Sequence, residues 1–216
     1  MSFQFFDPHA PLTITQGHLP HWDQAGATYF ITWRTADSIP KQVWERWRLE
    51  RDHWLLDHSI DPQQKDWRLL VEGLPEAERL DFRQFTTQLE SEVDACHGDC
   101  VLRDSNLRQI VVDALRFFDG QRYILADFVV MPNHVHVLVG GMIREAMLAQ
   151  VESWKRWTAK QINQALGQRG RFWQVESFDH LVRNEAAFMK FHRYISENPA
   201  KARLKKDEFT LWQRAA

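Results

Sequence analysis

The run Phe128 to Val139, FVVMPNHVHVLV, places His134 and His136 two residues apart among aliphatic and β-branched residues. Such a run favours a β-strand, in which side chains alternate between faces with a period of two. We therefore predict that both imidazoles point to one side of a sheet and that Val135 and Val137 point to the other. Neutral imidazole binds divalent first-row ions well, so the pair could begin a metal site. The alternative is that both are ordinary histidines of a sheet surface or core.

A second segment, NEAAFMKFHRYISENP, runs from Asn184 to Pro199. Asn184 is a preferred helix N-cap, and Pro199 disfavours helical geometry at the residue before it, which predicts a helix of about four turns that closes there. Tyr194 and Asn198 are one turn apart on this helix and share a face. If the helix packs over the histidine pair, the phenol offers a nucleophile and the amide oxygen a hard metal ligand. The simpler alternative is a core tyrosine and a C-terminal cap.

The segments MPNHVHVLV and RYISENPAKA together resemble the single-tyrosine HUH nucleases, and specifically the REP-associated tyrosine transposases. Similar pieces extend over most of the chain: GHLPHWDQAGATYFITWR, DACHGDCVLRD, SWKRWTAKQIN and RFWQVESFDHLVRNE. The resemblance implies metal-dependent cleavage and rejoining of single-stranded DNA hairpins, with Tyr194 as the nucleophile and a 5′-phosphotyrosine as the intermediate. The metal ligands would be His134, His136 and Asn198. Because the phosphate and amide oxygens are hard ligands, we expect Mg²⁺ or Mn²⁺.

The charge of the chain is divided unevenly between its halves. Residues 1–100 hold 9 basic and 17 acidic residues, a balance of −8, whereas residues 101–216 hold 18 and 12, a balance of +6. The basic half contains the histidine pair and Tyr194. Neutralising phosphates needs a local basic patch rather than a basic average, so the total of −2 is compatible with a DNA site in this half.

Basic residues interleaved with aromatic ones suit a single strand, whose phosphates are neutralised while its bases stack. His18 and His21 are added because they lie in the N-terminal segment that resembles the family. The competing interpretation of the 154–160 segment is that its tryptophans pack inward while its charges are solvated. The predicted DNA-binding residues are His18, His21, Trp154, Lys155, Arg156, Lys160, Arg171 and Lys190.

The hydrophobic pattern predicts an α+β fold of the ferredoxin-like or RRM-like kind, an antiparallel sheet with helices on one side, within one domain spanning 1–216. Residues 1–27 are expected to be irregular. A charged helical insertion at 38–94, with Trp44, Trp47 and Trp54 packed in its interior, would separate the first strand from the first core helix. Expected strands lie at 29–33, 123–130, 134–140 and 171–181, and expected helices at 105–118, 144–166 and 184–199.

Other classes of protein fit the sequence less well. It has no signal-peptide pattern and no apolar run near membrane-spanning length, which favours a cytoplasmic protein. Cys96 and Cys100 have no further ligand pair at zinc spacing, so we expect free thiols. A zinc hydrolase is disfavoured because the H-E-x-x-H pattern is absent. A catalytically silent DNA- or RNA-binding module of the same fold remains the alternative, and both a monomer and a homodimer remain open.

Overall fold

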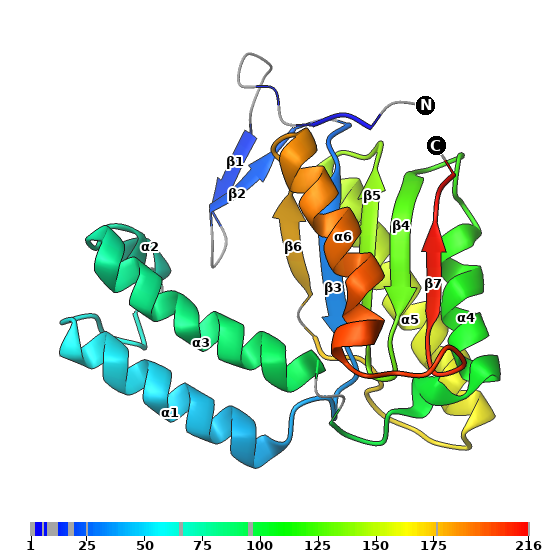
Figure 1. Ribbon diagram of the computed structural model, residues 1–216, viewed down its shortest axis with the longest axis horizontal. Coiled ribbons are helices and arrows are strands. Elements are labelled where there is room, and N and C mark those ends of the chain that lie inside the picture. Colours follow the sequence, from blue (N-terminus) through cyan, green and yellow to red (C-terminus); the bar gives the residue numbers. More distant parts are fainter. Residues whose placement is uncertain are drawn as a thin grey trace.

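A five-stranded antiparallel sheet forms the centre of the computed structural model (Figure 1). The structure describes residues 3–5, 7, 13–16, 20–24, 26–64, 67–94, 97–175 and 177–215. In spatial order the strands are β6 (Phe178–Leu181), β3 (Tyr29–Arg34), β5 (His134–Gly140), β4 (Ile124–Val130) and β7 (Thr210–Gln213). The first four of these, with the helices at 105–116 and 144–165, make a β-α-β-β-α-β unit, which further helices at 41–94 interrupt after β3. The predicted α+β, ferredoxin-like sheet is therefore confirmed.

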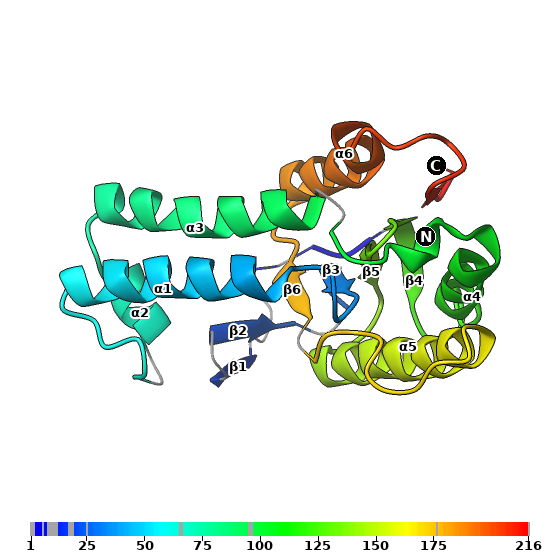
Figure 2. The ribbon, with the colours of Figure 1, turned by 90° about the horizontal axis from the view of Figure 1, so that it is seen from below.

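Helices cover both faces of this sheet. Helices α4 (Ser105–Arg116) and α5 (Arg144–Ala165) lie against one face, and α6 (Glu185–Lys201) lies against the other (Figures 1 and 2). The prediction of helices on one side holds for α4 and α5 but is wrong for α6. The second face is not wholly polar, because Phe30, Val129 and Leu138 leave apolar surface on it that α6 buries with Ile195.

Three helices connect β3 to the rest of the sheet: α1 (Lys41–Asp57), α2 (Trp67–Glu72) and α3 (Glu76–Asp94). Helices α1 and α3 lie side by side and extend away from the sheet (Figures 1 and 2). Between them, the Trp54 ring lies 4.9 Å from that of Phe82, and Trp47 Nε1 donates to the carbonyl oxygen of Phe85. The helical character of this segment and the packing of Trp47 and Trp54 agree with the prediction, whereas Trp44 remains 41% exposed.

Several short strands differ from the prediction. Residues expected to be irregular form a ribbon of β1 (Thr13–Gln16) and β2 (Pro20–Asp23). Strand β6 covers only the last four residues of the predicted 171–181 strand, because the chain before it follows a loop with one bridge, between Thr35 and Trp173. Strand β7 was not predicted: four residues carry too little alternation to be recognised.

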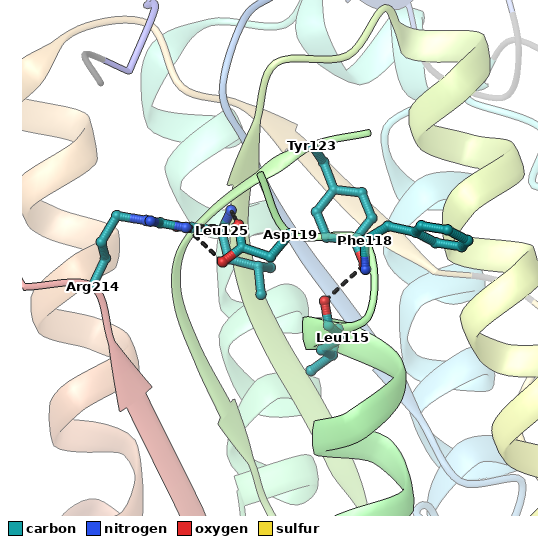
Figure 3. A network of polar contacts seen from close by, with 6 residues as sticks. All are labelled: Leu115, Phe118, Asp119, Tyr123, Leu125 and Arg214. Atoms are coloured by element: carbon teal, nitrogen blue, oxygen red, sulfur yellow. Dashed lines mark hydrogen bonds and ion pairs between the residues drawn. The ribbon is translucent and has the colours of Figure 1, made fainter. Parts of the chain in front are cut away.

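Polar contacts hold β7 at the edge of the sheet (Figure 3). The Arg214 guanidinium pairs with both carboxylate oxygens of Asp119 at 2.6 Å and donates from Nε to the carbonyl oxygen of Leu125. Asp119 also accepts from the backbone N–H of Leu125, and Trp212 of β7 stacks on Phe128 with ring centroids 5.4 Å apart. The chain after α6 therefore returns to cover the exposed edge of β4.

Within the described part of the chain, no helix is both long and apolar enough to cross a membrane. Cys100 is buried, and its Sγ lies 3.7 Å from the carbonyl oxygen of His97. Cys96 lies outside the described residues, so the expectation of free thiols stays a prediction.

Candidate active site

Strand β5 presents the two histidines on the face of the sheet that α6 covers. His134 and His136 are buried with ring centroids 4.7 Å apart, while Val135 and Val137 belong to the core on the opposite face. This confirms the alternation predicted from the sequence. The pairing with β3 places Thr32 opposite His136 and Arg34 opposite His134.

Each imidazole is oriented through its Nδ1 atom. His134 Nδ1 lies 2.7 Å from the side-chain oxygen of Asn133, so this nitrogen donates and Nε2 carries the lone pair. His136 Nδ1 lies 2.7 Å from the Thr32 hydroxyl, and its Nε2 is buried without a hydrogen-bond partner among the described residues. Metal-binding histidines commonly use one ring nitrogen in this way while the other binds the ion. Thr32 and Asn133 are orienting residues that the sequence did not reveal.

Both imidazoles are neutral near pH 7. The pKa of His134 is lowered to about 3, mainly by burial and also by the charge of Arg34, although a hydrogen bond with the Asn198 side chain acts in the opposite direction. Burial is also the main reason why the pKa of His136 lies well below its usual value, followed by the charges of His134 and Arg34. The neutral form is the one that binds a metal ion.

Helix α6 brings the predicted tyrosine and asparagine to this pair. It begins at an Asn184 cap, whose side chain accepts from the Ala187 N–H at 2.8 Å. The half-buried Tyr194 ring packs edge-on against His136 with ring centroids 5.1 Å apart. Asn198, one turn later, is completely buried. Helix α6 thus packs over the histidine pair, which is the condition that the sequence left open for bringing Tyr194 and Asn198 to it.

Two further features of α6 are its contact with β4 and the place where it ends. His192 Nδ1 lies 2.7 Å from a carboxylate oxygen of the buried Asp127 on β4, on the other side of α6 from Tyr194. The helix also continues through Pro199 to Lys201, whereas the sequence predicted that the proline would end it. A proline so close to the C-terminus disrupts only the last turn, where few backbone hydrogen bonds remain to be lost.

The donor atoms suit a divalent ion that also takes ligands from a substrate. The buried Nε2 of His136 is a nitrogen that an ion would satisfy. Among the described residues no group of three or more His, Cys, Asp or Glu could hold a metal. The buried amide of Asn198 is the further donor that the sequence predicts. Two imidazoles and an amide are all neutral and leave the charge of an ion uncompensated.

Two of the predicted DNA-binding residues are buried, and their prediction is wrong. Trp154 is only 3% exposed, stacks on Trp33 at 5.9 Å and donates from Nε1 to the Tyr123 hydroxyl. Lys155 is also buried, and its ammonium donates to the carbonyl oxygen of Val175 at 2.7 Å. Trp154 packs in the core, whereas Lys155 is covered by the loop before β6, and the interleaving of basic and aromatic residues had concealed both arrangements.

The structure does not test the remaining predictions of DNA-binding residues. Arg156 and Lys160 are exposed on α5, behind the sheet from the histidine pair, and Arg171 is exposed in the loop after it. Lys190 is exposed on α6, near His180. His21 lies on β2, and His18 lies outside the described residues. All of these remain predictions.

Comparison with solved structures yields a likeness in fold. No family model and no curated protein matches the chain. A solved structure described as "Structure of the REP associates tyrosine transposase bound to a REP hairpin" is similar, with 17% sequence identity over 86% of this chain and 74% of that one and a TM-score of 0.41. A likeness at this level says nothing about catalysis, so we derive the function from the site itself.

Proposed function

We propose that this protein cleaves and rejoins single-stranded DNA at hairpins through a covalent 5′-phosphotyrosine formed on Tyr194. The observation that carries the proposal is the packing of the Tyr194 ring against His136, whose Nε2 is buried without a hydrogen-bond partner in the described part of the chain. This contact supports the proposal because phosphoryl transfer to a tyrosine requires its hydroxyl to lie close to a metal-bound phosphate. His134 and Asn198 would complete the ligand set for Mg²⁺ or Mn²⁺.

The reaction exchanges one phosphoester for another. The Tyr194 hydroxyl oxygen forms a bond to phosphorus and releases its proton to solvent, while the 3′ oxygen of the DNA leaves and gains a proton. A divalent ion, when bound, supplies Lewis acidity at a non-bridging phosphate oxygen. Because the phosphotyrosine retains the energy of the broken ester, a 3′-hydroxyl can attack it and rejoin the strand without a nucleotide cofactor.

The surroundings of Tyr194 favour its role as a nucleophile. Its ring packs against Phe30 at 5.8 Å, and Phe30 in turn stacks on Phe191 at 4.4 Å, which fixes the phenol on one side. The Lys201 ammonium lies 5.3 Å from the centroid of the Tyr194 ring and pairs with Glu197. A cation at this position stabilises negative charge that develops on the phenol, modestly because Lys201 is half-exposed.

The direct test is to trap the covalent intermediate. A labelled single strand that carries an imperfect hairpin is incubated with the protein and Mg²⁺ or Mn²⁺, and the products are resolved under denaturing conditions with and without protease. We expect a labelled adduct that protease removes, together with a fragment that ends in a 3′-hydroxyl. Binding of the hairpin without metal and without cleavage would instead identify a silent DNA-binding module.

A further inference from the structure

Arg34 ends strand β3 on the same face of the sheet as the histidine pair. Along this strand Phe30 and Thr32 face α6, whereas Ile31 and Trp33 belong to the opposite core. The alternation therefore directs Arg34 toward the face that carries the candidate metal ligands. The register between β3 and β5 places Arg34 directly opposite His134.

The backbone on both sides of Arg34 is held in place. The Thr35 N–H donates to the carbonyl oxygen of Asn133 at 2.8 Å, in the turn that immediately precedes His134. The Gln174 N–H donates to the carbonyl oxygen of Arg34 itself at 2.9 Å. The point from which the Arg34 side chain extends is therefore fixed by the sheet and by these two backbone hydrogen bonds.

The charge of Arg34 acts at the candidate metal site. Arg34 is paired with His134 in the strand register, so its positive charge lies on the face that carries the two rings. The candidate ligands themselves contribute no negative charge, and no cluster of three or more acidic or other ligating residues occurs within the described ranges. Such a site disfavours a lone cation and attracts an anion.

We propose that Arg34 binds a phosphate of the DNA strand at this site and makes metal binding depend on that phosphate. The inference rests on the proposed function and adds to it the group that recognises the strand. A guanidinium offers a planar pair of donors that matches two phosphate oxygens. The phosphate then offsets the charge that opposes the ion, so strand and ion each increase the affinity of the other by the same factor.

The experiment separates binding from chemistry by using protein that carries Tyr194→Phe. Isothermal titration measures the affinity for Mn²⁺, first alone and then in the presence of saturating oligothymidine. Four proteins are compared: one that retains Arg34, and the variants Arg34→Gln, Arg34→Lys and Arg169→Gln. Arg169 is exposed in the loop after α5, so its change removes one positive charge away from the site. Thermal unfolding of each variant confirms that it is folded.

We expect Arg34→Gln to bind Mn²⁺ alone about tenfold more tightly, because a nearby positive charge is removed. The increase in Mn²⁺ affinity caused by the strand should be lost in this variant, retained in part by Arg34→Lys and unchanged in Arg169→Gln. An Arg34→Gln protein with the affinities and coupling of the Arg34 protein would overturn the inference.

The two proposals fail in different ways. If protein with Tyr194 forms the covalent adduct but Arg34→Gln leaves the coupling intact, only the role of Arg34 is wrong. If no adduct forms with Tyr194 while the coupling depends on Arg34, the site binds a metal and a phosphate together without the proposed chemistry. If Mn²⁺ binds neither alone nor with the strand in any variant, both proposals are rejected.

Discussion

The two faces of the central sheet use the same strands for different purposes. Toward α4 and α5, strand β5 contributes Val135, Val137 and Val139 to a continuous apolar core. Toward α6, the intervening residues of that strand include His134 and His136, buried among apolar rings. One face is filled with groups that gain free energy by leaving water, and the other retains polar groups whose burial costs free energy unless they are partnered.

The difference indicates where stability and chemistry reside. A buried nitrogen such as His136 Nε2, which has no hydrogen-bond partner in the described ranges, adds no hydrogen bond that would stabilise the folded state. Local features that oppose stability are expected at functional sites. The comparison therefore predicts that substitutions on the face toward α4 and α5 act on the free energy of unfolding, and that those beneath α6 act on activity.

We expect the largest effect when the same change, tyrosine to phenylalanine, is made at one residue on each face of the sheet. Tyr194→Phe should reduce adduct formation by more than about a thousandfold, since it removes the nucleophile and little packing. Tyr123→Phe should leave the adduct but lower the free energy of unfolding by about 1–2 kcal/mol, because the Tyr123 hydroxyl donates to the carbonyl oxygen of Leu115 at 2.7 Å within the core. Adduct yield and urea unfolding measure the two effects. Normal cleavage by Tyr194→Phe would exclude this nucleophile.

Two adjacent residues of β5 provide the next contrast. His136→Ala should abolish metal-dependent cleavage and weaken Mn²⁺ binding at least about tenfold, because a direct ligand is removed. Val137→Ala should retain cleavage and cost about 2 kcal/mol of unfolding free energy, since it opens a cavity in the core. Cleavage assays on both purified proteins, compared at equal folded fraction, test the contrast. The faces would not differ as proposed if Val137→Ala impaired cleavage as strongly as His136→Ala.

The metal-free protein should become less stable as the pH falls, because the pKa of His134, beneath α6, differs between the folded and the unfolded chain. The pKa of His134 is about 3 in the folded protein and about 6.5 when the residue is exposed, so between these values the unfolded chain binds more protons. The free energy of unfolding should therefore fall as the pH drops from about 6.5 toward 3, by at most about 1.4 kcal/mol per pH unit for this group. Urea unfolding at several pH values measures the slope.

Two variants separate this effect from a general acid response. His134→Asn should make the slope shallower, because the proton-binding group is gone. Val137→Ala should shift the whole curve downward without changing its slope. Equal slopes in the wild type and His134→Asn would show that the titration of His134 does not limit stability in this range.

The smallest effect is expected at Asn198. Asn198→Asp should bind Mn²⁺ more tightly in the absence of DNA, because a carboxylate oxygen is a stronger ligand than an amide oxygen. Turnover should nevertheless fall, since the added negative charge reduces the Lewis acidity that the phosphate experiences. Titration of Mn²⁺ into the wild type, Asn198→Asp and Asn198→Ala distinguishes a ligand from a packing residue. Three equal affinities would mean that Asn198 only completes the helix.

Much of what the sequence predicted correctly follows from the local periodicity of strands and helices. The shared face of His134 and His136 and the common stripe of Tyr194 and Asn198 follow from backbone repeats of 2 and 3.6 residues, which neighbouring residues set by themselves. The order of the core strands and helices was predictable for the same reason. The N-cap at Asn184 likewise needs only the residues beside it.

Only the tertiary structure decided which faces meet. The sequence did not predict that Arg34 lies opposite His134, because register depends on how two distant strands pair. Nor did it show that Trp154 packs in the core and that Lys155 is buried, since an amphipathic pattern identifies a stripe but not the partner that covers it. Helix α6 packs on the face of the sheet opposite to α4 and α5, because three separate strands contribute apolar surface there. Contacts between residues far apart in the chain therefore assembled the site from parts that the sequence had specified one by one.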